Sequence, residues 1–142
     1  MTVKDAVDYY DDFFDDFKKQ KALILIDEME LGLNQKISTL STGQKGRLKI
    51  ILTLSRNVSL YLIDEPLNGL DPISRSIVID TIGKEKLLDR TFIISTHIID
   101  ELETIMNRLI MFKDGKVFLN DECSNICQRQ NMSLSEYYKT VY

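Results

Sequence analysis

One short apolar run in the middle of the chain places the strongest limit on its fold. Leu60–Ile63 is apolar throughout, and the polar and turn-forming residues Asp64-Glu65-Pro66 follow at once. Such a run is typical of a parallel strand that is buried on both faces. Residues 91–95 form a second run, β-branched and aromatic, which also predicts a strand. Parallel strands need helical connections, so we expect an α/β fold.

Capping residues mark two helix starts. Ser41 and Gln44 form an S-x-x-Q capping box before a long helix that is expected to end near Asn57. Ser133 and Glu136 form a second box before a terminal helix. Three further helices are expected at residues 22–31, where Gly32 would be a left-handed C-cap, at 72–87 and at 98–106.

Turn chemistry near the C-terminus predicts a hairpin. Lys113-Asp114-Gly115 separates the two segments Leu109–Phe112 and Lys116–Leu119. An Asp-Gly pair supplies the left-handed backbone that a tight hairpin turn requires.

An aromatic stripe at the N-terminus has two interpretations. Val3, Val7, Tyr10, Phe14 and Phe17 follow a 4-3-4-3 spacing, which places them on one face of a helix. The stripe packs on the domain's own core, or it docks a partner.

Charge and length exclude several classes of protein. The length of 142 residues suits one compact domain. The net charge of −4 disfavours a nucleic-acid backbone or an anionic membrane surface as the main partner. The longest apolar run, Ala22–Ile26, is too short to span a bilayer, and no signal-peptide pattern opens the chain. Cys123 and Cys127 are too few for a disulfide framework or a zinc site, so we expect reduced thiols.

Polar residues at the expected strand ends could carry chemistry. Asp64 lies at the carboxyl end of a strand, where ligands gather in parallel sheets, and could bind Mg²⁺. Glu65 could hold an attacking water, and His97, after the second strand, could orient a γ-phosphate. Ser41 and Gly43 begin a helix, where free amides favour an anion such as phosphate, although a capping Ser followed by Gly is more often a purely structural cap.

Taken together, these segments resemble the ATP-binding domain of ABC transporters, from the middle of that domain to its C-terminus. Four segments carry the resemblance through their order and spacing. Leu40–Gln44 resembles the signature motif, with Thr42 where the family usually has Gly, and Leu60–Glu65 resembles Walker B. Asn68–Asp71 resembles the D-loop, and His97 resembles the switch histidine. The closing residues 133–137 are similar to the tail of export-type members.

The resemblance implies a role for each matching residue. Asp64 would hold Mg²⁺ through water, Glu65 would polarise the attacking water, and His97 would contact the γ-phosphate of ATP. The signature residues Ser41, Thr42, Gly43 and Gln44 would lie at ATP bound to a second subunit, and Asp71 would lie at the seam of that dimer.

The resemblance also implies an organisation. Residues 1–57 would form the helical subdomain, and residues 58–142 the C-terminal part of a P-loop ATPase core, packed as one compact unit. No G-x-x-x-x-G-K-[ST] occurs in the sequence, and the glutamine loop and the adenine-stacking aromatic are absent too. We therefore expect the chain to begin at the helical subdomain, to bind ATP weakly and not to hydrolyse it alone.

A missing Walker A strand would also leave a vacancy in the sheet. In the family that strand lies between residues 91–95 and Leu109–Phe112, so these two strands would pair directly, exchange with a second copy, or leave the chain poorly stable. Self-association or a rearranged edge is the outcome we expect.

The expected function is that of part of a transport ATPase subunit. It would dimerise with a second ATP-binding subunit and bind a transmembrane permease on the cytoplasmic face of the membrane, with ATP and Mg²⁺ as cofactors. The alternative is a non-catalytic half that donates Ser41 and Gly43 to ATP on a partner ATPase. A soluble ATPase that acts on ribosomes or DNA is disfavoured by the acidic charge and the lack of basic clusters.

Overall fold

The computed structural model describes residues 1–142 and divides them into two units, Met1–Thr96 and His97–Tyr142. The sequence predicts one unit with an internal division after residue 57, and that position falls inside the first unit. Contacts cross that position, because helix α3 (Thr42–Leu54) packs on helix α4 (Pro72–Lys86) and Lys21 forms a 2.5 Å ion pair with Glu85. These contacts join residues 1–57 to the strands and helix that follow.

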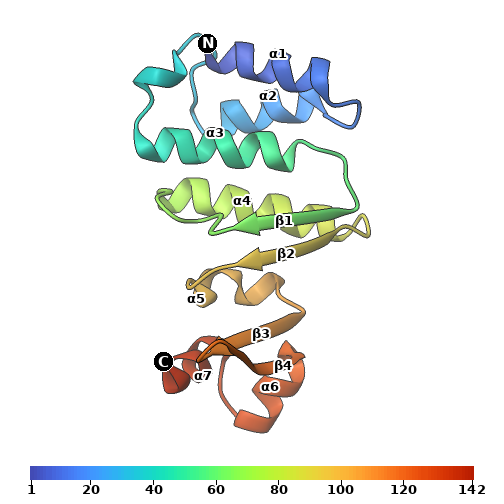
Figure 1. Ribbon diagram of the computed structural model, residues 1–142, viewed down its shortest axis with the longest axis vertical. Coiled ribbons are helices and arrows are strands. Elements are labelled where there is room, and N and C mark those ends of the chain that lie inside the picture. The colour runs from blue at the N-terminus through green and yellow to red at the C-terminus, as the bar shows by residue number, and fades with distance from the viewer. The chain divides into compact units, whose positions relative to one another are not determined.

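Three helices that contact one another open the first unit (Figure 1). They are α1 (Val3–Phe13), α2 (Lys19–Glu28) and α3 (Thr42–Leu54), with a short 3-10 helix at Ile37–Thr39 before α3. Their inward faces are apolar and buried, as the helical periodicity of the sequence requires. The first unit therefore has a helical core of its own.

The expected aromatic stripe is only partly helical. Val3 and Val7 are buried on α1, but the helix ends at Phe13, so Phe14 and Phe17 lie beyond it. The last turn of α1 has no basic residue to complement the carbonyl end of the helix dipole, and acidic residues crowd it. Phe17 is buried all the same, and its backbone forms an isolated antiparallel bridge with Arg56, which follows α3.

The left-handed residue that follows α2 lies two positions before the predicted one. Glu30, not Gly32, adopts the left-handed conformation, with φ of 54°. The amides of Glu30 and Leu31 donate to the carbonyls of Asp27 and Ile26, which is the Schellman pattern. The buried side chain of Leu31 sets this position, since it must turn back onto the core.

The start of α3 confirms the predicted capping box. Ser41 Oγ accepts from the Gln44 amide at 3.2 Å, and Gln44 Oε1 accepts from the Ser41 amide at 2.9 Å. The helix ends at Leu54 rather than near Asn57, because the buried Ser55 bonds back to the carbonyl of Ile51 at 2.7 Å.

Two parallel strands follow, as predicted. Strand β1 (Leu60–Asp64) pairs with β2 (Thr91–Ser95), and α4 (Pro72–Lys86) connects them. The expectation that the first strand is buried on both faces is wrong. Tyr61 and Ile63 are buried, but Leu62 is 70% exposed because α4 covers only one face of the sheet.

Helix α4 begins at a well-formed cap. Asp71 is the N-cap and Pro72 follows at the first helical position. Asp71 Oδ1 accepts from the Ser74 amide at 3.0 Å, and Asp71 Oδ2 accepts from the Ser74 hydroxyl at 2.6 Å. These two bonds, with the nearby Arg47 guanidinium, lower the pKa of Asp71 from 3.8 to about 2.

The second unit contains the predicted hairpin. Asp114 and Gly115 adopt left-handed φ angles of 49° and 71° at its turn. Its elements are α5 (Ile99–Leu102), a 3-10 helix (Glu103–Ile105), β3 (Arg108–Lys113), β4 (Lys116–Glu122), α6 (Cys123–Gln130) and α7 (Leu134–Val141). Strands β1 and β2 form one two-stranded sheet in the first unit, and β3 and β4 form another in the second unit.

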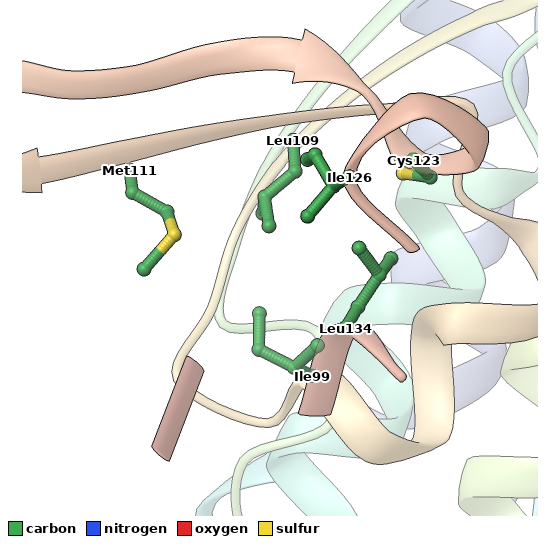
Figure 2. Close-up of a cluster of buried hydrophobic side chains, with 6 residues drawn as sticks. All are labelled: Ile99, Leu109, Met111, Cys123, Ile126 and Leu134. Carbon is green, nitrogen blue, oxygen red and sulfur yellow. The ribbon is translucent and has the colours of Figure 1, made fainter. Parts of the chain in front are cut away.

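Six buried side chains form the core of the second unit (Figure 2). They are Ile99, Leu109, Met111, Cys123, Ile126 and Leu134. The structure records no disulfide at Cys123 or Cys127, and Cys127 packs against this core. Helix α6 is not predicted by the sequence, because its start has no side-chain cap and most of its residues are polar.

The core of the first unit yields a stability prediction. Ile51 is fully buried on α3, so Ile51→Ala removes packed methyl groups and leaves a cavity. We expect a loss of about 3 kcal/mol in the free energy of unfolding, measured by urea denaturation with circular dichroism. Lys49→Ala, on the exposed side of the same helix, is the matched control. A loss no larger than that of the control would contradict the assigned packing.

The cap of α4 yields a pH prediction. Because the folded-state pKa of Asp71 is lowered from 3.8 to about 2, its stabilisation is complete above the unfolded value and disappears as the pH falls towards 2. Asp71→Asn keeps a capping side chain but cannot titrate, so this part of the acid dependence should vanish in the variant. Urea denaturation at a series of pH values checks it, and identical acid profiles for both proteins would refute it.

Candidate functional site

Two carboxylates lie at the carboxyl end of β1. Asp64 is the last residue of the strand, and the parallel register places Ser95 opposite, where its hydroxyl donates to Asp64 Oδ1. Glu65 then leaves the strand with φ of 47°, while its amide still donates to the Ser95 carbonyl at 2.9 Å. The Thr96 hydroxyl donates to Glu65 Oε2 at 3.3 Å. Hydroxyl groups at the last residue of β2 and at the residue after it therefore orient the two carboxylates.

The backbone of Glu65 is strained. A left-handed conformation at a residue other than glycine costs about 1 kcal/mol, and such residues cluster at functional sites. The strain aims a carboxylate out of the strand at the edge where parallel sheets bind ligands. That position suits a residue that orients a water molecule.

The chain does not build a metal site from protein ligands alone. No group of three or more His, Cys, Asp or Glu side chains could hold an ion. Mg²⁺, however, is often bound by one or two carboxylates together with water and phosphate oxygens. The exposed carboxylate of Asp64 fits that second arrangement.

The first turn of α3 packs closely on the turn before α4. A Cβ atom at Gly43 would lie 3.1 Å from the carbonyl oxygen of Gly69, so a side chain there would force the two segments apart. At Gly46 such an atom would lie 3.5 Å from Leu70 Cδ2. Because Gly43 and Gly46 have no side chain, the beginning of α3 can pack closely on the Asn68–Asp71 segment.

This packing leaves amides available at the start of α3. The capping box pairs the amides of Ser41 and Gln44 with side-chain oxygens. Thr42 and Gly43 occupy the first helical positions, where an amide has no acceptor within the helix. The helix dipole adds about half a positive charge at the same point. An anion can therefore bind there.

The predicted site residues of the first unit form two groups. Ser41, Thr42, Gly43 and Gln44 lie at the start of α3, where Gly43 packs on Gly69 in the Asn68–Asp71 segment. Asp64 and Glu65 lie at the carboxyl end of β1. His97 is the first residue of the second unit and has an exposed side chain.

Sequence reasoning missed three residues that hold the site. Arg47 forms an ion pair with Asp71 at 2.9 Å, and Ser95 and Thr96 bind the two carboxylates. The signal for Ser95 was its place at the end of the second strand, in register with the end of the first. The signal for Arg47 was its position one helical turn after Gly43.

Comparison with known proteins identifies the fold and the family. A family model described as "AAA domain, putative AbiEii toxin, Type IV TA system" matches residues 28–103, which is more than half of the chain. A curated relative, an uncharacterised ABC transporter ATP-binding protein of Methanocaldococcus jannaschii, is 30% identical over 102 residues, covering 72% of this chain and 38% of that protein. The chain spans less than half the length of the curated relatives that it matches.

Solved structures agree with this assignment. An ATP-binding subunit of an ABC transporter superposes with a TM-score of 0.85 at 22% identity, covering 99% of this chain and 62% of that chain. A dimeric ATP-binding cassette in a post-hydrolysis state, bound to ADP and phosphate, superposes with a TM-score of 0.63 at 28% identity, covering 73% and 46%. The α/β fold predicted from the sequence, with P-loop ATPase strands and a helical signature subdomain, is confirmed.

No helix of the chain has the length and apolar character needed to cross a membrane. With the family match over residues 28–103, the similarity to ABC transporter ATP-binding proteins and the shared fold, the chain belongs to the AAA-domain family and is similar to part of the ATP-binding domain of ABC transporters.

Proposed function

We propose that this chain is a portion of an ABC transporter subunit that binds and hydrolyses ATP to drive transport across a membrane. The observation that carries the proposal is the close packing of the α3 start, with its free amides, on the Asn68–Asp71 segment. Within the same unit, Asp64 and Glu65 lie at the carboxyl end of a parallel strand. An anion site and a paired-carboxylate strand end are the two parts that ATP hydrolysis needs from this region.

Each site residue has a distinct role in this proposal. Asp64 would hold Mg²⁺ through water, and the ion would neutralise phosphate charge. Glu65 would accept a hydrogen bond from the attacking water and orient it, while Thr96 holds the other side of the carboxylate. His97 would donate to the γ-phosphate.

The helix start would serve ATP on a second subunit. Ser41, Thr42, Gly43 and Gln44 would contact that nucleotide through the free amides and the helix dipole, and Asp71 would lie at the seam between the two subunits. The dimeric cassette with bound ADP and phosphate supports this arrangement, because it shares the fold of this chain.

A permease would be the membrane partner, and the chain would act on the cytoplasmic face. We propose residues 1–57 as the helical subdomain that docks on it. On α1 the exposed aromatic residues are Tyr9 and Phe13, whose rings stack at 4.7 Å, whereas Phe17 is buried. Tyr9 and Phe13 lie outside the expected aromatic stripe. We propose this exposed pair, with acidic residues near it in the sequence, as the docking surface in place of the buried Phe17.

A second candidate function is that of a non-catalytic partner. The α3 start is fully formed, whereas G-x-x-x-x-G-K-[ST] does not occur in the 142 residues. A chain with these features could donate Ser41 and Gly43 to ATP held by another ATPase. The oriented carboxylate of Glu65 favours the first function, because a donating half does not need it.

The ATP chemistry of the chain can be measured directly. We expect the purified chain to bind MgATP weakly and to release no measurable phosphate, because it has no loop that cradles the phosphates. Calorimetry measures the binding, and a phosphate-release assay measures the turnover. Robust turnover that is lost in Glu65→Gln, but kept in the exposed control Asp27→Asn, would show that the chain is catalytic alone.

Self-association can be tested at the exposed sheet face. Leu62 and Ile93 lie side by side in the register, are 70% and 59% exposed, and border a hollow of about 220 Å³. We expect concentration-dependent association that Leu62→Asp weakens at least about tenfold, which corresponds to about 1.4 kcal/mol. Sedimentation velocity measures it, with Leu88→Asp as the control on another exposed leucine. A chain that stays monomeric at high concentration would refute the proposal.

A further inference from the structure

One guanidinium group links three elements of the first unit. Arg47 lies on α3, one turn after Gly43. Its Nη2 atom is 2.9 Å from Asp71 Oδ2, at the N-cap of α4. Its Nη1 atom donates to the carbonyl oxygen of Met29, the C-cap of α2, at 2.8 Å. A single side chain therefore connects the ends of α2 and α4 to the first half of α3.

The surroundings of Arg47 indicate that net stability is not the reason for this placement. The side chain is 22% exposed, and its Nε atom is buried without a hydrogen-bond partner. Each buried unpaired donor costs free energy, and so does the removal of a cation from water. Asp71 does not need Arg47 to cap α4, because Ser74 supplies both capping hydrogen bonds.

The backbones that Arg47 joins are also in close contact. A Cβ atom added at Gly43 would lie only 3.1 Å from the carbonyl oxygen of Gly69. Leu70 lies against Gly46 on the next turn of α3. A shift of the Asn68–Asp71 segment would therefore press on the first turn of α3, and the reverse holds as well.

We propose that Arg47 is a positioning residue that holds the first turn of α3 and the Asn68–Asp71 segment in one arrangement. A loss of local structure in one of these segments would therefore also loosen the other. The inference rests on the proposed function, in which the α3 start contacts nucleotide and Asp71 lies at the seam between two subunits, but Arg47 itself touches no nucleotide. It acts through Asp71 and Met29.

The two directions of the contact require a guanidinium. A planar fork donates to the Asp71 carboxylate and to the Met29 carbonyl at the same time. An ammonium group at the end of a lysine can keep the charge but not both geometries. Arg47→Lys should therefore restore part of the link, whereas Arg47→Met removes it.

Amide hydrogen exchange tests the link segment by segment. The amides of Asn68 and Leu70 are bonded within the turn, and the amide of Lys45 is bonded to Ser41 in the first turn of α3. In Arg47→Met we expect exchange at all three amides to become at least about threefold faster, with partial recovery in Arg47→Lys. Arg56→Met is the control, since it removes a comparable ion pair with Asp16, at 2.7 Å, within the same unit.

A double-mutant cycle completes the experiment. Asp71→Asn keeps the cap and removes only the charge, so it stays informative if Arg47→Met folds poorly. We expect the exchange effects of Arg47→Met and Asp71→Asn to be non-additive in the double variant. Additive effects, or exchange at Asn68 and Leu70 no faster than in Arg56→Met, would overturn the inference. No nucleotide enters either measurement, so this outcome is separate from that of the ATP experiments.

Discussion

The parallel pairing of β1 with β2 is the interaction on which the rest of the first unit depends. It brings the carboxyl ends of both strands to one edge, and its register sets Ser95 opposite Asp64. The hydroxyl bonds to the two carboxylates follow from that register. Because the strands run in the same direction, the chain between them must cross over as α4, whose first residues then stand at the same edge.

The second constraint is the close approach of α3 to the beginning of α4. Glycine at position 43 allows the backbones to come together, and Arg47 closes the contact from the side. The Ser41–Gln44 box satisfies polar groups of this helix start with its own side chains. The helix geometry leaves the next amides without an acceptor inside the helix. Close packing and unpaired amides are therefore two consequences of the same local structure.

Local signals in the sequence were sufficient for most elements. Capping boxes predicted the starts of α3 and α7, the Asp-Gly pair predicted the hairpin, and the apolar runs predicted β1 and β2. Helix ends were less predictable. The ends of α2 and α3 depend on Leu31 and Ser55, which are placed by burial in the core and not by their own turn preference. Helix α6 was missed because it has no cap and becomes a helix by packing Cys123 and Ile126 on the second core.

By itself, the sequence determined the α/β class, the order of the elements and the residues that mark an ABC-type ATP-binding domain, because capping, turn chemistry and motif spacing are local properties of the chain. The tertiary structure alone decided how these residues are held. Leu62 is exposed because α4 covers only the other face of its sheet. The ion pair of Arg47 with Asp71 and the hydroxyl bonds to Asp64 and Glu65 join groups that are 24 to 31 positions apart in the sequence. Such contacts arise from the register of strands and the packing of helices, which no local pattern contains.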